Sequence, residues 1–258
     1  MICVKITFLG TGTSQGVPVI ACECKTCISE DTNDKRLRTS ILIENDDTVI
    51  VIDAGPDFRQ QMLAEKVKKL DAIILTHEHK DHIAGMDDVR AFNYKSHDAI
   101  DVFAEERVQK AVRKEYSYVF AEYQYPGIPK MRLNPIPDYG FNVGSLMINP
   151  LRVYHYRLPV YGFRIGNFAY ITDANYIPEE TKEKIFGVKY LVLNALRKEK
   201  HISHFSLREA IDFIMQVSPR KAFITHIGHQ MGRHKDVSGE LPPGIALGYD
   251  GLSFQCDE

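Results

Sequence analysis

Short hydrophobic runs alternate with polar and glycine-rich segments along most of the chain. Runs that are rich in β-branched and aromatic residues and bounded by turn-forming residues are typical of β-strands. We expect strands at residues 5–9, 39–44, 48–53, 71–75, 101–104, 145–153, 161–165, 168–172, 189–195 and 221–225. The second and third of these strands predict a hairpin that turns at residues 45–47.

Helical spacing of hydrophobic residues appears between the strands. We expect helices at residues 56–66, 85–92, 105–119, from 178 onward, and from 206 to 217. Ser206 and Glu209 have the spacing of a capping box, which marks the start of the last of these helices. Residues 125–139 contain four prolines and are expected to be irregular, and residues 29–38 are charged and are expected to form a solvated loop or short helix.

Strands and helices alternate in two blocks, with no linker between the blocks and no short repeat. A length of 258 residues lies at the upper end of what one domain covers, so we expect a single domain over residues 1–258. Two sheets packed against each other with helices outside would fit this order of elements. The pattern therefore predicts an α/β layered fold.

Charge and hydrophobicity narrow the possible partners. The chain has 32 basic and 34 acidic residues, a net charge of −2, so no global field favours nucleic acid or an anionic membrane, and stable nucleic-acid binding is not expected. The longest hydrophobic runs are far shorter than a bilayer span, and the start at Met1 and Ile2 lacks a charged leader followed by a long apolar segment. We expect a cytoplasmic protein.

The strongest chemical signal follows the expected strand at residues 71–75. His77, His79, Asp81 and His82 lie within six positions at the carboxyl end of that strand. Imidazole and carboxylate groups together match the preferences of zinc, manganese or iron, and a rigid strand would hold them in place without burying them deeply. Glu78 lies between these residues in the sequence and is expected to point toward solvent, as is Lys80.

Three further metal-binding residue types follow other expected strands, namely His155, Asp173 and His226. Ligands gathered from several strand ends suit a rigid dinuclear site. The sequence predicts two divalent cations, one held by His77, His79 and His155, the other by Asp81, His82 and His226, with Asp173 shared by both. Taken alone, His155 or Asp173 could equally be an ordinary polar group at a strand end.

Three of the five cysteines, Cys22, Cys24 and Cys27, are clustered within six positions, which favours a metal site over a disulfide framework in a reducing compartment. Cys3 and Cys256 are expected to be small buried hydrophobic residues. The glycine-rich residues 10–18 could cradle a phosphate, but their spacing is that of neither a P-loop nor a dinucleotide motif, and a tight turn is the simpler interpretation.

The order of these site residues resembles the metallo-β-lactamase superfamily over essentially the whole chain. That resemblance implies an αββα four-layer sandwich with a dinuclear site at one edge. It also implies that Asp53, at the end of the expected strand 48–53, braces the metal loop without binding metal.

A narrower resemblance is to the PhnP-like cyclic-phosphate phosphodiesterases of the carbon–phosphorus lyase pathway. It is carried by the cysteine cluster together with His226 and His229, three positions apart. It implies one structural zinc ion held by Cys22, Cys24, Cys27 and His229, a closed tetrahedral set that leaves no position for water. It also points to His204 as the general acid, with His201, three residues away, as the competing candidate.

These features predict a metal-dependent phosphodiesterase that acts on a small, cyclic ribose or nucleoside phosphodiester. Two cations (Zn²⁺ or Mn²⁺), with Asp81 among their catalytic ligands, would lower the pKa of a shared water to produce hydroxide, and an imidazole would protonate the poor alkoxide leaving group. The alternatives are a tRNA 3′-end endonuclease, although no basic glycine-rich arm is present, and a hydrolase of a non-phosphate ester or thioester. A non-catalytic metal-stabilised binding module would not need the full ligand set. Monomer and homodimer remain open.

Overall fold

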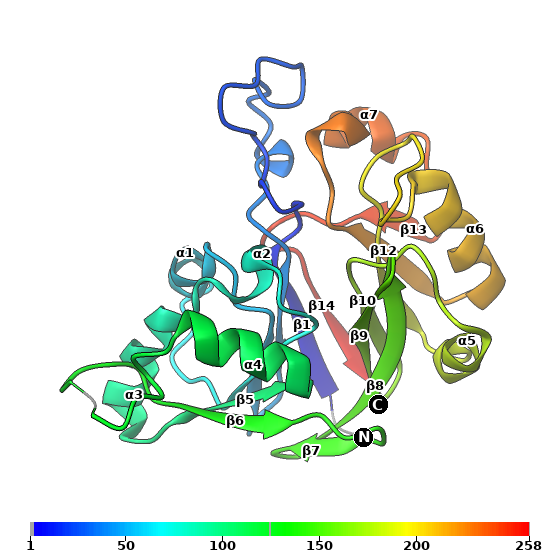
Figure 1. Ribbon diagram of the computed structural model, residues 1–258. Coiled ribbons are helices and arrows are strands. Elements are labelled where there is room, and N and C mark those ends of the chain that lie inside the picture. The colour runs from blue at the N-terminus through cyan, green and yellow to red at the C-terminus, as the bar shows by residue number, and fades with distance from the viewer. Residues whose placement is uncertain (1–2, 124, 258) are drawn as a thin grey trace.

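The computed structural model describes residues 3–123 and 125–257, so Met1 and Ile2 of the expected leaderless start lie outside the described residues. Within these ranges the chain forms two seven-stranded sheets that face each other, with helices on the outer face of each (Figure 1). This arrangement is the αββα sandwich expected from the sequence. The start of the first strand pairs with the end of the last one, with Cys3 opposite Asp257.

The first sheet has the spatial order β14-β1-β2-β3-β4-β5-β6. Its strands are β1 (Cys3–Gly10), β2 (Ser40–Glu44), β3 (Val49–Ile52), β4 (Ala72–Ile74), β5 (Ile100–Ala104), β6 (Met131–Pro135) and β14 (Ser253–Asp257). The strands from β14 to β3 pair in antiparallel fashion, including the predicted hairpin of β2 and β3, and those from β3 to β6 pair in parallel.

The second sheet has the order β13-β12-β11-β10-β9-β8-β7. Its strands are β7 (Phe141–Val143), β8 (Leu146–His155), β9 (Leu158–Ile165), β10 (Phe168–Ile171), β11 (Tyr190–Asn194), β12 (Lys221–Thr225) and β13 (Ile245–Leu247). The strands from β10 to β13 are parallel to one another, and the rest are antiparallel. Each sheet therefore has a parallel half, and the carboxyl ends of parallel strands gather at one edge.

The helices separate into two groups, one on each outer face (Figure 1). They are α1 (Phe58–Ala64), α2 (Lys80–Ile83), α3 (Arg90–Ser96) and α4 (Glu106–Glu115) on the first sheet, and α5 (Glu179–Ile185), α6 (Leu207–Val217) and α7 (His234–Ser238) on the second. Short 3₁₀ turns occur at Thr32–Asp34, Met86–Val89 and His229–Met231. Both hydrogen bonds of the predicted capping box form at Ser206 and Glu209, which fixes the start of α6.

Three hydrophobic layers hold the sandwich together. The central one lies between the sheets, where Phe8 of β1 and Phe223 of β12 pack edge to face with ring centroids 5.6 Å apart. The outer two lie between each sheet and its helices, with Phe58 of α1 on one side and Ile214 of α6 on the other. Because every strand in the middle of a sheet is covered on both faces, these strands are nearly continuous runs of hydrophobic residues.

The prediction of an irregular segment at residues 125–139 was wrong in part, because it contains β6. This strand pairs with β5 at the edge of the first sheet, and only Met131 within it is fully buried. Pro135 is tolerated at its end because an edge strand need not donate every backbone N–H. The sequence prediction also omitted β7, β13 and β14, which all lie at the edges of the two sheets and are three to five residues long.

The expectation of a solvated loop or short helix at residues 29–38 was confirmed in part, by the 3₁₀ helix Thr32–Asp34, but the segment is not fully solvated. Asp34 and Arg36 are buried, with 1% and 4% of their surface exposed. Arg36 donates to Thr11 Oγ1 and to the Gly248 carbonyl, and its Nη2 lies 3.1 Å from His234 Nδ1. These contacts anchor the segment to the opposite end of the chain, since a buried charge must be paired or hydrogen-bonded.

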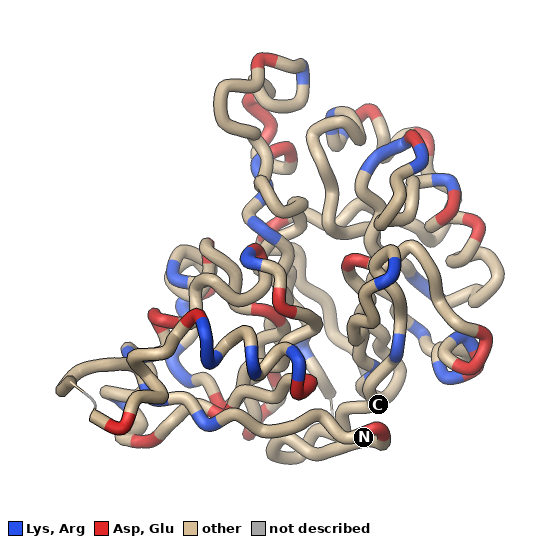
Figure 2. Tube along the Cα trace, in the orientation of Figure 1, with Lys and Arg blue, Asp and Glu red and all other residues tan. Residues whose placement is uncertain are grey.

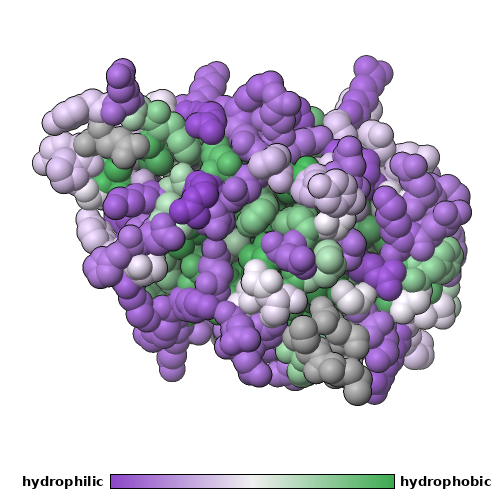
Figure 3. Space-filling model, turned by 90° about the horizontal axis from the view of Figure 1, so that it is seen from below, coloured by the Kyte–Doolittle hydropathy of each residue, from purple (hydrophilic) through white to green (hydrophobic). Residues whose placement is uncertain are grey.

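No helix in the described ranges is both long and apolar enough to cross a membrane. Acidic and basic residues are interspersed along the trace (Figure 2), as the near-neutral net charge indicates. Seen from the end that carries β7, hydrophobic residues show at the centre of the face, surrounded by hydrophilic ones (Figure 3).

Candidate metal centre

The metal loop is positioned by β4, whose three residues are completely buried between β3 and β5. His77 lies three residues beyond the end of β4, and α2 begins at Lys80 with His79 as its N-cap. Two glycines allow the loop to approach its neighbours closely. A Cβ atom at Gly55 would lie 1.9 Å from the Asp81 carbonyl oxygen, and one at Gly85 would lie 1.9 Å from the Gly55 carbonyl oxygen.

Asp53 braces this loop through three hydrogen bonds. Its Oδ1 accepts from the Thr76 backbone N–H at 2.9 Å, and its Oδ2 accepts from the Thr76 hydroxyl at 2.8 Å and lies 2.7 Å from His82 Nδ1. Asp53 is fully buried and directly follows β3. With Nδ1 of His82 engaged in this way, Nε2 is the nitrogen left for a metal, which is the usual role of an outer carboxylate.

The structure brings the seven predicted metal ligands together. Ligand atoms of Asp81, His82, Asp173 and His226 lie within 4.8 Å of one another, and so do those of His155, Asp173 and His204. The rings of His77, His79 and His155 form a triangle, with centroid distances of 4.5 Å (77 to 79), 5.2 Å (79 to 155) and 5.8 Å (77 to 155). Asp173 belongs to both groups, but the second group contains His204 in place of the predicted His77 and His79.

Three of the centre's residues adopt a left-handed backbone conformation just after a strand. These are Asp53 (φ 64°), Asp173 (φ 55°) and His226 (φ 56°). Residues other than glycine rarely adopt positive φ, and such strain persists only where the surrounding structure enforces it. The turn immediately after β3, β10 or β12 thus directs a polar side chain into the space between the sheets.

The electrostatics of the centre fit a cation. Burial lowers the pKa of His77 well below its ordinary value, which favours the neutral imidazole that a metal requires. Burial alone would raise the pKa of Asp173, but His226 and His82 outweigh it and keep this carboxyl ionised. His82 Nε2 lies 3.2 Å from Asp81 Oδ2 and 3.3 Å from Asp173 Oδ2, yet it has no hydrogen-bond partner with acceptable geometry among the described residues. A divalent cation would satisfy all three atoms.

His204 lies beside the predicted ligands, in the segment between β11 and α6. It is 8% exposed, and its ring centroid is 4.6 Å from that of His155 and 4.9 Å from that of His226. Its Nδ1 is 3.8 Å from Asp173 Oδ1. Burial lowers the pKa of His204 to about 3, although the Asp173 carboxylate opposes this shift. The competing candidate, His201, is more exposed, with its ring centroid 5.3 Å from that of His204.

The cysteine cluster lies on the loop at residues 18–30, which stands out from the sandwich (Figure 1). His229 Nδ1 lies 3.2 Å from Cys22 Sγ, 3.4 Å from Cys24 Sγ and 3.5 Å from Cys27 Sγ. Tetrahedral zinc with ordinary bond lengths would separate sulfur and nitrogen ligands by about 3.5 Å, so these four residues could hold such an ion. For Cys24, hydrogen bonds from the Cys27 backbone and from His229 overcome the effect of burial and lower the thiol pKa to about 6.

Of four other side chains with a stated expectation, Glu78 and Cys3 differ from it, whereas Lys80 and Cys256 agree. Glu78 points away from the ligands but does not face open solvent, because Arg107 pairs with it and also donates to the Pro159 carbonyl at 2.7 Å. Lys80 is exposed and pairs with Glu115. Cys256 is buried as expected, whereas Cys3 is exposed, because β1 begins at the surface beside β14.

The glycine-rich loop has a role that the sequence did not reveal. Thr13 Oγ1 lies 3.2 Å from His226 Nε2, and the Thr13 backbone N–H donates to the Ile227 carbonyl at 3.1 Å. The loop therefore joins the first sheet to the residues after β12. The only sequence signal was the position of the loop at the end of a strand, because its contact with His226 spans most of the chain.

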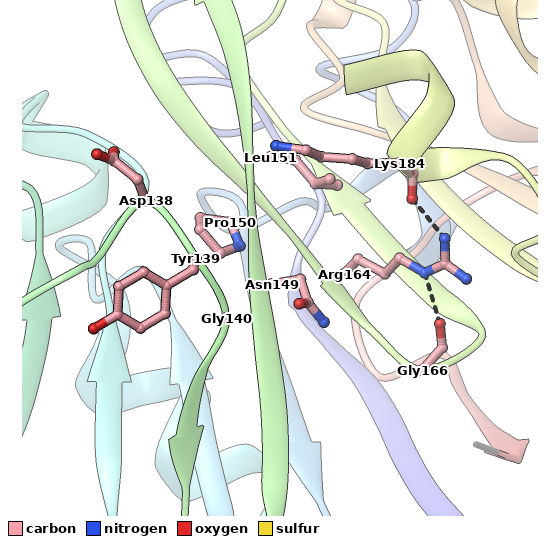
Figure 4. A pocket seen from close by; sticks show the side chains of 9 residues that line it. All are labelled: Asp138, Tyr139, Gly140, Asn149, Pro150, Leu151, Arg164, Gly166 and Lys184. Carbon is pink, nitrogen blue, oxygen red and sulfur yellow. Dashed lines mark hydrogen bonds between the residues drawn. The ribbon is translucent and has the colours of Figure 1, made fainter. Parts of the chain in front are cut away.

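A cavity of about 520 Å³ lies elsewhere and contains none of the predicted ligands. It is open to solvent between the segment before β7 and the end of α5, and Arg164 projects into it (Figure 4). The Arg164 guanidinium donates to the carbonyls of Gly166 and Lys184 at 2.9 and 2.6 Å. Because its charge is already used to hold backbone carbonyls, this cavity is a weaker site candidate than the histidine–aspartate cluster.

Residues 48–227 match the family model of the β-lactamase superfamily domain. The chain belongs to this superfamily. Its strand-end histidines and aspartates are thus the metal-binding residue types of a metallo-hydrolase fold, which implies a divalent metal. The identification also confirms the sandwich architecture expected from the sequence.

Within the superfamily, the crystal structure of a diphosphatase from the PhnP family is similar to this chain at a TM-score of 0.92 and 34% identity, covering 98% of both chains. Human tRNase Z, short form, shares the fold at a TM-score of 0.70 and 16% identity, covering 97% of this chain and 98% of its own. An octanoyltransferase of Porphyromonas gingivalis is 42% identical over 257 residues, 98% of this chain. The chain spans only 52% of the length of that relative.

Proposed function

We propose that this protein is a metal-dependent phosphodiesterase that hydrolyses small phosphodiesters, with cyclic ribose or nucleoside phosphates as the first class to test. The observation that carries the proposal is the buried His204 imidazole, whose Nδ1 lies 3.8 Å from Oδ1 of Asp173, the carboxylate predicted to bind both metal ions. A phosphodiester needs this combination, because its alkoxide leaving group departs poorly unless it is protonated.

In the proposed reaction, one set of residues would bind the metal ions and another residue would donate the proton. In this proposal His77, His79 and His155 would hold one metal ion, Asp81, His82 and His226 would hold the other, and Asp173 would bind both. Divalent cations at these positions would supply Lewis acidity toward the phosphate oxygens and a nucleophilic water at neutral pH. His204, held within the same cluster, would donate a proton to the departing oxygen. Because burial keeps this imidazole neutral, the bound phosphate anion would have to raise its pKa and restore the protonated form. The local positive charge of bound cations would offset the net charge of −2 and allow an anion to approach.

The cysteine cluster has a separate role in the proposal. Cys22, Cys24, Cys27 and His229 would hold one structural zinc ion, and the S–N distances of 3.2–3.5 Å support this assignment. His229 lies three residues after His226, so this ion would fix the protruding loop to the segment that enters the metal centre.

The names of the similar proteins point to further substrate classes that should be tested. The PhnP-family structure is named a diphosphatase, so a P–O–P bond is a second candidate for the same groups. The octanoyltransferase name favours an acyl ester or thioester only weakly, because that name belongs to a protein about twice as long. The tRNA endonuclease alternative depends on the fold alone, at 16% identity.

The test is a substrate panel on purified protein whose metal content is measured in the same preparation. With added Mn²⁺ or Zn²⁺, we expect cleavage of bis(p-nitrophenyl) phosphate and of 2′,3′-cyclic nucleotides. Hydrolysis of a thioester or a lactam combined with inactivity on every phosphodiester would reverse the assignment.

His204→Ala tests the acid directly. We expect turnover of cyclic nucleotides to fall by about 100-fold or more, within the range attributed to general acids, with metal content unchanged. If this variant loses metal, His204 is a ligand and His201 becomes the acid candidate.

A further inference from the structure

The segment that carries His204 is held at its base by backbone hydrogen bonds. The Phe205 N–H donates to the Ala174 carbonyl at 2.9 Å, and the Leu196 N–H donates to the Phe205 carbonyl at 3.0 Å. Ala174 is itself fixed by the buried Asn194, whose amide donates to the Ala174 carbonyl at 2.9 Å and accepts from its N–H at 2.8 Å. The base of the segment is therefore tied rigidly to the end of β10.

The tip of the segment, residues 201–203, is held by side chains instead. Asn175 Nδ2 donates to the Ile202 carbonyl at 3.2 Å, and His155 Nδ1 lies 2.7 Å from the Ser203 carbonyl oxygen. His204 Nδ1 is buried and has no hydrogen-bond partner among the described residues. The position of the His204 ring thus depends on packing and on the backbone that carries it.

Asn175 uses both ends of its amide. While Nδ2 holds Ile202, Oδ1 accepts the Tyr156 backbone N–H at 2.5 Å. Tyr156 begins the turn after His155 in the left-handed conformation (φ 59°), and the Asn175 N–H donates to the Tyr154 carbonyl at 2.9 Å. One half-buried side chain thereby joins the turn that carries the metal ligand His155 to the tip of the segment that carries His204.

We infer that Asn175 is a positioning residue for the general acid, one that holds the His204 segment against the β8–β9 turn so that the imidazole faces the leaving group. This inference rests on the proposed function. These two contacts require an amide side chain, because the Tyr156 N–H needs an acceptor and the Ile202 carbonyl needs a donor. Aspartate could accept from Tyr156 but would repel the Ile202 carbonyl, since an ionised carboxylate has only acceptors.

Two substrates with different leaving groups can distinguish a positioning role of Asn175 from a general effect on the structure. p-Nitrophenolate leaves without a proton, whereas the ribose alkoxide of a 2′,3′-cyclic nucleotide requires one. A displaced acid should therefore slow the cyclic nucleotide alone. For Asn175→Ala we expect turnover of the cyclic nucleotide to fall by roughly 10- to 100-fold, because small misplacements of a catalytic group have effects of this size. Turnover of bis(p-nitrophenyl) phosphate should change by less than about threefold.

The experiment compares Asn175→Ala, Asn175→Asp and His204→Ala with the matched control Asn134→Ala. Asn134 is also half-buried and donates two hydrogen bonds, to Asp101 and to the Arg132 carbonyl, but it lies on β6 of the other sheet. Each variant is assayed on both substrates, its metal content is measured, and amide hydrogen exchange is followed in the peptide that contains residues 201–205.

Support requires that both Asn175 variants slow the cyclic nucleotide selectively, keep their metal and exchange the 201–205 amides faster than Asn134→Ala does. Equal losses on both substrates, loss of metal, or unchanged kinetics and exchange would overturn the inference. If His204→Ala is impaired while Asn175→Ala is not, the inference alone fails. If the wild-type protein cleaves neither phosphodiester, the proposed function fails and the inference fails with it.

Discussion

The histidine–aspartate centre and the cysteine cluster meet at His226 and His229, three residues apart, yet they are built in different ways. Residues of the centre come from the ends of β4, β8, β10 and β12, and most are buried. The cysteines come from one protruding loop, where Cys24 is exposed, and only His229 joins them from a distance.

The two sites differ in what holds their candidate ligands in position. In the centre, the two sheets place the side chains, and Asp53 fixes His82 without any metal. In the cysteine loop, few hydrophobic residues are buried, and Ile20 is 94% exposed, so a bound ion would have to supply most of the order. Removing a ligand from the centre should therefore affect chemistry most, whereas removing one from the loop should affect stability most.

We expect the largest effect from Asp81→Ala. If this variant kept its activity and its metal, the contrast drawn between the two sites would be wrong. Asp81 lies among His82, Asp173 and His226. Burial and the Asp173 carboxylate raise the pKa of its carboxyl, but His82 and His226 outweigh them and lower it, so Asp81 is ionised and available to a cation. We expect phosphodiesterase activity to fall by at least about 100-fold, the upper end of effects seen for residues around metal ligands, together with loss of active-site metal.

Asp138→Ala is the matched control for Asp81→Ala. Asp138 is exposed and lines the open cavity near β7, so its removal should leave metal content and activity unchanged. Full activity in Asp81→Ala, or an equal loss in Asp138→Ala, would contradict the assignment of the centre.

The next effect is expected from Cys24→Ala. Loss of about one zinc per chain should accompany a fall in the free energy of unfolding on the order of 3 kcal/mol, because structural zinc binding is coupled to folding but the two-sheet core forms without it. Activity should fall far less than in Asp81→Ala. Metal analysis and urea unfolding measure both quantities, with Cys3→Ala, at an exposed cysteine, as the control. Unchanged zinc content would remove the cysteine site.

We expect the smallest effect from a change at Asp250, which hydrogen-bonds residues on both sides of the cysteine loop. Its carboxylate accepts from the Leu37 N–H and the Thr11 hydroxyl, both at 2.7 Å. Burial nevertheless raises the pKa of Asp250 from 3.8 to about 6. Between pH 4 and pH 6 the folded protein thus binds the proton more strongly than the unfolded chain does, so this group's contribution to stability falls as pH rises and becomes constant above pH 6.

Asp250→Asn removes this titration. From pH 4 to pH 7 we expect the stability of the variant, relative to wild type, to improve by about 2–3 kcal/mol, which corresponds to a pKa shift of roughly two units. Urea unfolding at the two pH values measures the change. A relative stability that stays constant with pH would show that the Asp250 carboxyl titrates normally.

Much of the fold and the composition of the site could be read from the sequence, because the signals are local. Residues buried on both faces of a strand form continuous hydrophobic runs, and these runs gave β2, β3, β4, β10, β11 and β12. The candidate ligands stand directly after such runs, as His77 and His226 do, so their shared location followed from the way parallel strands align. The capping box at Ser206 is equally local.

Other features were decided only by the tertiary structure, because they depend on partners far away in the chain. Edge strands such as β6 carry little hydrophobic signal, and their pairing supplies what their sequence lacks. Arg36 reads as a solvated charge but is buried, because Thr11, Gly248 and His234 converge on it. The link from Asn175 to both Tyr156 and Ile202 exists only because the second sheet brings together the segments that follow β8, β10 and β11. A pattern of residues can indicate the groups that do chemistry, but only packing determines which other groups hold them.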